Sequence, residues 1–248
     1  MTAWKKKNVT SYYINNRSKL KDLYLSESKL LLKLKNKKIK NILDFGCATG
    51  NFYKIFKKMF KKINYVGMDF EKEMIKNAKK IFYKKSDVKF LLSNKNNLSF
   101  KKNTFDFTFC TSVLHHVKEY KKVIKQLIML SSKYIFIDSP RIYYGKDFVG
   151  LMNLDKRFDT NKIKKNNVKY YVVNIKKYVN FLKPLLKKNK IDKVYFFCNK
   201  LPYSKEQMSF NHEIFYMTIL FIKSKRNRKL KKIVYSNVPK IKRLLSGI

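Results

Sequence analysis

The fold is decided by one stretch, Ile42-Leu43-Asp44-Phe45-Gly46-Cys47-Ala48-Thr49-Gly50-Asn51-Phe52, which predicts a buried strand, a glycine turn and the start of a helix. An apolar run from Ile39 to Phe45 ends at the glycines, and Asn51 can cap the helix. The apolar face of that helix consists of Phe52, Ile55, Phe56, Met59 and Phe60. Glycine removes the side chain that would keep a ligand away from the backbone N–H groups of such a turn. The junction therefore predicts a ligand-binding loop.

The spacing of the glycines indicates which ligand the loop binds. A dinucleotide-binding turn needs G-x-G-x-x-G, whereas this loop reads Asp44-x-Gly46-x-Ala48-x-Gly50. The pattern resembles motif I of the class I methyltransferases that depend on S-adenosylmethionine (SAM). The resemblance implies that the loop, with Cys47, surrounds the methionine part of SAM and that Asp44 binds its ammonium group. Ala48 departs from the family, which often has glycine there. A similar junction in another α/β fold is the alternative.

Length and composition fit one globular α/β domain. The chain has 248 residues, of which 45% are hydrophobic and 30% charged. Its three cysteines are far apart and form no C-x-x-C pair, which suits a reducing compartment and gives no zinc signature. No signal peptide is apparent and no apolar run is long enough for a membrane span. We therefore expect a soluble, cytoplasmic protein without a bound metal.

The formal net charge of +43 raises the question of a nucleic-acid partner. Only six of the 59 basic residues are arginine, and alanine, glycine and proline are scarce as well. A strongly A/T-rich genome would produce this composition whatever the function. Arginine is also the side chain that suits bidentate contacts with phosphate and guanine. We therefore attribute most of the charge to composition and expect no specific nucleic-acid binding, although weak attraction to polyanions at low salt follows from the charge alone.

A second acid lies where the resemblance requires one. Residues 63–69 predict the second strand, which ends at Asp69 and Phe70, one strand-helix-strand unit after Asp44. In the family, the acid at this place accepts hydrogen bonds from both ribose hydroxyls, and a carboxylate suits a diol because it only accepts. The resemblance therefore assigns Asp69 and Phe70 to the cofactor. An N-cap for the helix that starts at Glu71 is a compatible second role of Asp69.

The third and fourth strands end in further cofactor residues. Residues 87–92 predict the third strand, and the resemblance implies that Asn94 accepts from the adenine amino group. Residues 104–117 open a strand with F-D and follow it with L-H-H, which closely resembles SAM methyltransferases that act on small molecules and lipid precursors. Thr111 and Ser112 then lie near the methionine end of SAM, because ligands sit beyond the carboxyl ends of parallel strands.

Polar residues beyond these strand ends are the candidates for catalysis and acceptor binding. His115 could act as a general base, because the unperturbed pKa of histidine lies near neutrality; packing beneath the loop is the alternative. Asp138, at the end of the predicted fifth strand, is the second catalytic candidate. The candidates for acceptor binding are His116, Arg141 and Tyr143. A salt bridge that caps the loop between Asp138 and Arg141 is an equally good interpretation.

The order of elements predicts a Rossmann-like α/β/α sandwich. Strands at 193–198 and 213–222 form an antiparallel pair, which completes a seven-stranded, mostly parallel sheet with one antiparallel strand. We divide the chain into an N-terminal helical lid segment (1–38), the methyltransferase domain (39–223) with a substrate cap at 141–172, and a basic tail (224–248). The tail could lie on an anionic membrane surface or contact RNA. We favour a solvated, partly disordered extension.

The resemblance implies that the chain methylates a small-molecule acceptor (a sugar, lipid precursor or secondary metabolite) by O-methylation. SAM brings an activated methyl group, so alignment supplies much of the acceleration. RNA or protein methylation is the alternative within the same fold, although residues 111–114 lack the N-P-P-Y type tetrapeptide of many enzymes that methylate amino groups. A non-catalytic protein of this fold that binds nucleic acid or membrane through its lysines is the alternative from another class. The oligomeric state is not predicted.

Overall fold

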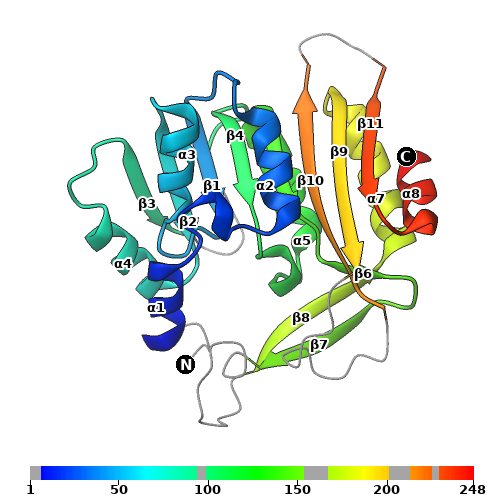
Figure 1. The fold of residues 1–248 in the computed structure, drawn as a ribbon, viewed down its shortest axis with the longest axis horizontal. Helices are drawn as coiled ribbons and strands as arrows, with labels where there is room; N and C mark the ends of the chain where they lie inside the picture. The colour runs from blue at the N-terminus through cyan, green and yellow to red at the C-terminus, as the bar shows by residue number, and fades with distance from the viewer. Residues whose placement is uncertain (1–6, 94–98, 154–166, 201–212, 225–228) are drawn as a thin grey trace.

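One mixed sheet runs through the molecule in the computed structural model, which describes residues 7–93, 99–153, 167–200, 213–224 and 229–248 (Figure 1). Its described strands are β1 (Asn41–Phe45), β2 (Asn64–Asp69), β3 (Val88–Leu92), β4 (Phe105–Cys110), β5 (Ser131–Asp138), β6 (Arg141–Tyr143), β7 (Phe148–Asn153), β8 (Asn167–Asn174), β9 (Ile191–Lys200), β10 (Phe215–Lys223) and β11 (Lys231–Ser236). The order along the sheet is β3-β2-β1-β4-β5-β10, followed by β9 and β11 on one path and by β6, β8 and β7 on the other.

The first five strands are parallel, as the sequence predicts. β1 pairs with β2 and β4, β2 with β3, and β4 with β5. β10 runs antiparallel to both β5 and β9. The predicted seven-stranded core is thus present, with its reversed final strand, and the fold class is confirmed. The prediction of seven strands in total is wrong, because β6, β7, β8 and β11 extend the same sheet.

Helices cover both faces of this sheet. They are α1 (Lys7–Asn15), α2 (Leu25–Leu31), α3 (Phe52–Phe60), α4 (Lys72–Ile81), α5 (Tyr120–Leu130), α7 (Ile175–Lys188) and α8 (Pro239–Ser246), with short 3₁₀ turns at Leu20–Asp22, Leu32–Leu34 and Leu114–His116. Buried side chains of α2, α3 and α4 form the core on one face, and those of α5, α7 and α8 form the core on the other. Successive strand residues alternate between them: Ile42 belongs to the first core and Leu43 to the second.

The C-terminal residues fold onto the sheet. β11 pairs in parallel with β9, and α8 buries the side chains of Ile241 and Leu245 completely. The two residues are four apart and therefore share one face of the helix. The interpretation of residues 224–248 as a solvated extension is wrong for the described part, because this apolar face packs into the core instead of meeting water.

The segment predicted as a substrate cap contributes a strand pair. β7 and β8 are antiparallel, and β8 also pairs with β6 next to β10. Residues 154–166, which connect β7 to β8, lie outside the described residues. α7 runs without a break through Pro184. None of the described helices is both long enough and apolar enough to span a bilayer.

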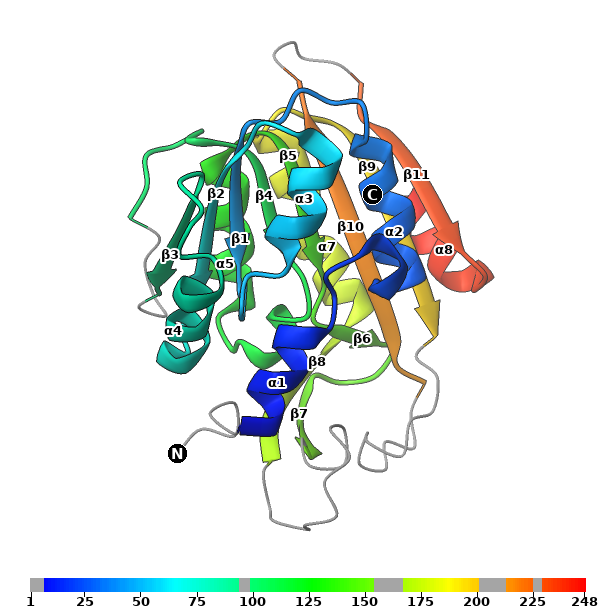
Figure 2. The same cartoon turned by 60° about the vertical axis from the view of Figure 1, so that its left-hand side comes forward.

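α1 occupies a different place from the other N-terminal helix. Figures 1 and 2 show α2 on the face of the sheet, whereas α1 lies beyond the end at which β4 finishes. β7 and β8 project from this end too (Figure 2). Because parallel strands of one sheet finish at a common edge, the N-terminal segment and this strand pair flank the place where a ligand is expected.

Candidate active site

The turn after β1 holds three residues in the left-handed region of backbone conformation. The φ angles are +81° for Gly46, +48° for Ala48 and +82° for Gly50. A Cβ atom added to Gly46 would lie 2.1 Å from Cγ2 of Val113, and one added to Gly50 would lie 2.6 Å from the ring of Phe90. Only glycine fits at these two positions, because a Cβ atom would clash with a neighbouring side chain and because the positive φ angles are unfavourable for other residues. Ala48 adopts the same kind of conformation at a cost of roughly 1–2 kcal/mol.

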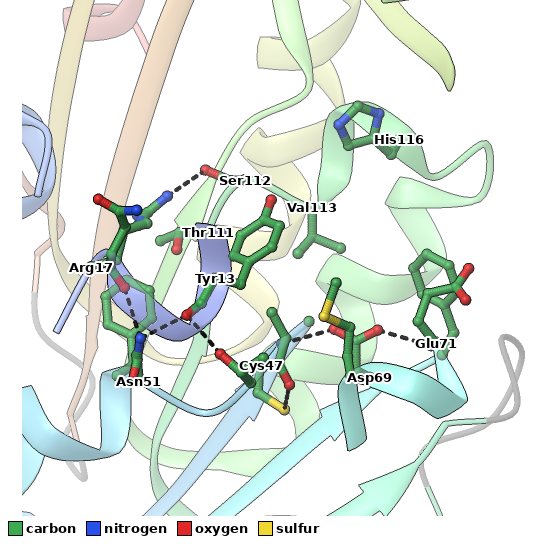
Figure 3. Close-up of a pocket in the computed structure, with 17 residues that line it drawn as sticks. Tyr13, Arg17, Cys47, Asn51, Asp69, Glu71, Thr111, Ser112, Val113 and His116 are labelled. Atoms are coloured by element: carbon green, nitrogen blue, oxygen red, sulfur yellow. Dashed lines mark hydrogen bonds between the residues drawn. The ribbon is translucent and has the colours of Figure 1, made fainter. Parts of the chain in front are cut away.

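This turn borders a pocket at the carboxyl ends of β1, β2 and β4 (Figure 3). The space between its walls is about 730 Å³, with the open solvent at its mouth included. Seven of the ten predicted cofactor residues line it, namely Gly46, Cys47, Ala48, Asp69, Phe70, Thr111 and Ser112. His116, predicted to bind the acceptor, lines it too. The structure therefore brings together residues from three predicted strand ends.

Of the predicted cofactor residues that the structure describes, Asp44 and Gly50 do not line the pocket. Asp44 is 1% exposed and accepts a hydrogen bond from the hydroxyl of Tyr65 beneath the turn. Burial raises the pKa of Asp44 to about 7. Gly50 faces the rings of Phe82 and Phe90. Asn94 lies outside the described residues. Asp44 and Gly50 thus support the loop from beneath. Asp44 does not reach the surface of the pocket.

Asp69 lines the pocket and accepts two backbone hydrogen bonds. Its Oδ2 accepts from the backbone N–H of Ala48 and its Oδ1 from that of Glu71, each over 2.9 Å. These bonds join the loop after β1 to the loop after β2. Glu71, and not Asp69, occupies the N-cap position of α4, so the prediction of Asp69 as the N-cap is wrong. Burial nevertheless raises the pKa of Asp69 to about 6. A carboxylate has about four lone-pair sites, so this side chain can still accept from a diol in the pocket.

The residues that follow α1 are fastened to the same loop. The side-chain amide of Asn51 donates to the carbonyl oxygens of Tyr13, Ile14 and Asn16 over 2.7, 2.9 and 2.8 Å. Thr49 donates its hydroxyl to the carbonyl of Tyr13 over 2.7 Å. We call residues 13–17 the N-terminal strap. Asn51 stands at the N-cap position of α3, but its side chain makes no capping hydrogen bond, so that prediction is wrong.

Arg17 ends the strap and lines the pocket, and the sequence interpretation did not include it. Its Nη2 lies 2.5 Å from Oε1 of the fully buried Glu27, and its Nη1 donates to Oγ of Ser112 over 3.0 Å (Figure 3). Burial alone would lower the pKa of Arg17, but the Glu27 carboxylate outweighs it and raises this pKa above its ordinary value. Nε of Arg17 has no hydrogen-bond acceptor among the described residues. The available signal was that arginine is rare in this lysine-rich chain.

Asp138 supports the pocket from outside its lining. It has no exposed surface, and it accepts from the N–H of Ser112 (3.0 Å) and from the hydroxyls of Tyr216 (2.6 Å) and Thr218 (3.0 Å). Burial and the nearby Glu27 carboxylate raise the pKa of Asp138 to about 7. Ser112, held in this way, adopts a φ of +57°. The geometry makes Asp138 a residue that positions Ser112 and gives it no access to a substrate.

The two adjacent histidines differ in position. His115 is 1% exposed, outside the pocket lining, and its ring centroid lies 5.0 Å from that of Tyr170. His116 lines the pocket, and its Nδ1 lies 2.9 Å from the carbonyl oxygen of Lys169. A carbonyl only accepts, so in this hydrogen bond Nδ1 bears the proton and the neutral ring keeps Nε2 as its base. A general-base role therefore fits His116 better than His115.

The other predicted acceptor-binding residues, Arg141 and Tyr143, belong to β6 and lie outside the pocket lining. Both are buried, and the hydroxyl of Tyr143 donates to the carbonyl of Lys146. Arg141 donates its Nε–H to the hydroxyl of Tyr170. No ion pair between Asp138 and Arg141 occurs in the part of the chain that the structure describes, and Asp138 is occupied by neutral donors.

Comparison with protein families identifies the domain. Residues 43–129, from β1 to the end of α5, match the family model described as a methyltransferase domain. The match covers 87 of the 248 residues, about a third of the chain. The matched region contains the glycine turn, Asp69, Ser112 and both histidines.

A curated relative extends the similarity of the methyltransferase domain. An uncharacterized protein of Methanocaldococcus jannaschii is 33% identical over 119 residues, which cover 47% of this chain and 48% of that protein. The match thus spans about half the length of the relative.

Solved structures share the fold of the methyltransferase domain. The N-terminal domain of EvdMO1, crystallised in the presence of S-adenosylhomocysteine (SAH) and D-fucose, is 11% identical, with 81% of this chain and 84% of that chain covered and a TM-score of 0.55. A SAM-dependent methyltransferase from Aquifex aeolicus is 17% identical, with 89% of this chain and 100% of that chain covered and a TM-score of 0.50. At these identities the likeness shows the fold.

Proposed function

We propose that this chain is an enzyme that transfers the methyl group of SAM to a small-molecule acceptor, by O-methylation. The observation that carries the proposal is the position of Asp69, which joins the glycine turn to α4 and opens onto the same pocket as Ser112 and His116. An acid for the ribose, a glycine turn for the methionine part and a histidine at the strand ends thus share one cavity.

The residues of the pocket fit SAM. Gly46, Cys47 and Ala48 line the pocket, and Gly46 can carry no side chain because Val113 packs where its Cβ atom would lie. Asp69 would hold the ribose diol. Arg17 has a permanent positive charge and a buried Nε–H that meets no acceptor in the part of the chain that the structure describes, and both suit the carboxylate of the methionine part. SAM, when bound, supplies a methyl group already activated on a sulfonium.

The protein's own contribution is to hold the reactants and keep water out. The N-terminal strap crosses from the glycine turn to Ser112 through Asn51, Thr49 and Arg17, and so covers one side of the pocket. Alignment of two reactants in a closed site can lower a barrier by about 7–11 kcal/mol. Where the acceptor hydroxyl keeps its proton, Nε2 of His116 is the base placed to take it.

Calorimetric titration with SAH tests the cofactor site. We expect micromolar or tighter binding by the wild-type protein and a loss of roughly 100-fold in Asp69→Ala, because a hydrogen bond to a charged acceptor contributes about 1.5–3 kcal/mol. Asp192→Ala in β9, outside the pocket lining, is the control and should bind as the wild type does. A folded wild-type protein that does not bind SAH would exclude the proposal.

Transfer itself is then tested with radiolabelled SAM and a panel of hydroxylated sugars, lipid precursors and phenols. His116→Gln should lower the turnover number more than the affinity for SAH, because the base acts on the acceptor. Turnover only with RNA or protein substrates would contradict the proposed acceptor class while leaving the cofactor site intact.

A further inference from the structure

Two arginines are buried next to the active site, although 53 of the 59 basic residues are lysine. Arg17 lies within the pocket lining, and Arg141 lies just beyond β5 with 8% of its surface exposed. A lysine would supply the same charge, but only arginine offers a planar fork that can donate to two partners in fixed directions. Arg17 uses its fork on Glu27 and Ser112. The group that Arg141 binds through its guanidinium has to be inferred from the surroundings of this side chain.

Protein groups fix the guanidinium of Arg141 but do not neutralise it. Its Nε donates to the hydroxyl of Tyr170, and its Cζ lies 4.6 Å from the ring centroid of Tyr216 and 5.6 Å from that of Tyr170. Two aromatic faces therefore hold the plane of the fork. Nη1 is buried and has no hydrogen-bond acceptor among the described residues.

The buried acid Asp138 does not accept from this nitrogen. Burial alone would lower the pKa of Arg141, but interactions with Tyr170 and Tyr216 and, after them, with Asp138 raise it. The oxygens of Asp138 accept from Ser112, Tyr216 and Thr218. An unsatisfied buried donor costs about 1–3 kcal/mol, and more when it is charged. A cost of this size indicates that Nη1 of Arg141 donates to a ligand when one is bound.

Tyr170 connects Arg141 to the active site. Its hydroxyl is bonded to Arg141, and its ring centroid lies 5.0 Å from that of His115 and 5.9 Å from that of His116, which lines the pocket. Arg141 is thus separated from the pocket by one tyrosine ring, on the side of His116. The acids of the pocket, Asp69 and Glu71, lie on a different side from Arg17 and Ser112 (Figure 3).

We propose that Arg141 binds a carboxylate of the methyl acceptor, so that the substrate class is a small hydroxylated carboxylic acid. This inference rests on the proposed function and specifies its acceptor. One guanidinium balances one carboxylate, and the surrounding Tyr170 and Tyr216 rings offer no second cation for a doubly charged phosphate. The tyrosines suit a flat or apolar body attached to the carboxylate.

The test compares two probes that differ only in charge, 4-hydroxybenzoate and 4-hydroxybenzamide, on protein saturated with SAH. Ligand-observed NMR at millimolar concentration measures both affinities. We expect the wild-type protein to bind the carboxylate at least about tenfold more tightly than the amide, in line with a charge-assisted hydrogen bond. Arg141→Gln should abolish that preference, while the control Arg243→Gln, on the exposed face of α8, should keep it.

Each outcome decides between the two proposals. SAH binding to each variant is measured first: a wild-type protein that does not bind SAH contradicts the proposed function itself. A wild-type protein that binds SAH but prefers neither probe, or binds neither, overturns the role of Arg141 alone. An Arg141→Gln variant that keeps the preference overturns it as well. Should that variant fail to fold, the wild-type ratio of the two affinities still decides the matter.

Discussion

The side-chain amide of Asn51 donates to the main-chain carbonyl of Tyr13 over 2.7 Å, and this contact ties the end of α1 to the cofactor loop. Asn51 directly follows Gly50 in the chain, so it belongs to the cofactor loop. The strap that it binds can therefore move only together with this loop. The same amide reaches Ile14 and Asn16. Binding of a cofactor in the loop and ordering of the N-terminal segment are thereby linked.

Asn51→Asp should release the strap. The carboxylate cannot donate, and it would face three carbonyl oxygens, so roughly 1 kcal/mol is lost for each of the two N–H groups. We expect SAH affinity to fall on the order of tenfold and limited proteolysis to cut near residues 13–17 more quickly. Asn64→Asp, an exposed asparagine of β2, should change neither measurement.

Ala48 should tolerate glycine and reject valine. Ala48→Gly removes the strain of a φ of +48° but adds freedom to the unfolded chain, so the free energy of unfolding should change by less than about 1 kcal/mol. A β-branched residue is an outlier in this region, and Ala48→Val should destabilise by more than about 1 kcal/mol. Urea denaturation of the three proteins measures both effects. Equal stability of the valine variant would mean that the loop relaxes.

Asp44→Asn should change how stability depends on pH. The pKa of Asp44 is raised from 3.8 to about 7 in the folded protein, so the folded state binds the extra proton between these values. Its stabilising contribution is complete below the unfolded pKa and is lost as pH rises through about 7. The side chain at position 44 of the variant does not titrate. As pH rises from about 4 to about 7, the free energy of unfolding of the variant minus that of the wild type should therefore increase by on the order of 1 kcal/mol per pH unit, and above about pH 7 it should stay constant. Urea unfolding at a series of pH values checks this, with Asp192→Asn as the control.

Leu245→Ala tests the packing of α8. Leu245 has no exposed surface, and a buried leucine cut to alanine typically costs 2–5 kcal/mol. The exposed neighbour variant Lys242→Ala should stay within about 0.5 kcal/mol of wild type. Two variants of equal stability would instead support a solvated tail.

The parts of the fold that follow from local pattern were predictable. Apolar runs that end at Gly46, Asp69 and Cys110 gave the parallel strands and the loops at their ends, because each signal lies within one stretch of sequence. Seven pocket residues followed from that order. β11 and α8 were not predicted, since dense lysines hide the spacing of Ile241 and Leu245.

The buried polar contacts could not be derived from sequence. Arg17, Glu27 and Ser112 meet although 95 positions separate Arg17 from Ser112. Asp138 lies at the end of a strand, where a catalytic acid is also expected. Its burial and its hydrogen bonds with Tyr216 and Thr218 of β10, which the sequence does not reveal, indicate a supporting role instead. The catalytic and acceptor-binding assignments stay predictions, to be decided by the substitutions above.

The site draws on both ends of the chain, and this has a consequence for how the protein is made. Ser26 and Thr218 are hydrogen-bonded across 192 positions, and Glu27 lies 3.5 Å from the hydroxyl of Tyr216 across 189. Contacts of such separation slow folding, because a long loop must close before they form. During synthesis on the ribosome, Arg17 and Glu27 emerge long before β10 does. The cofactor pocket can therefore reach its final form only after β10 has left the ribosome.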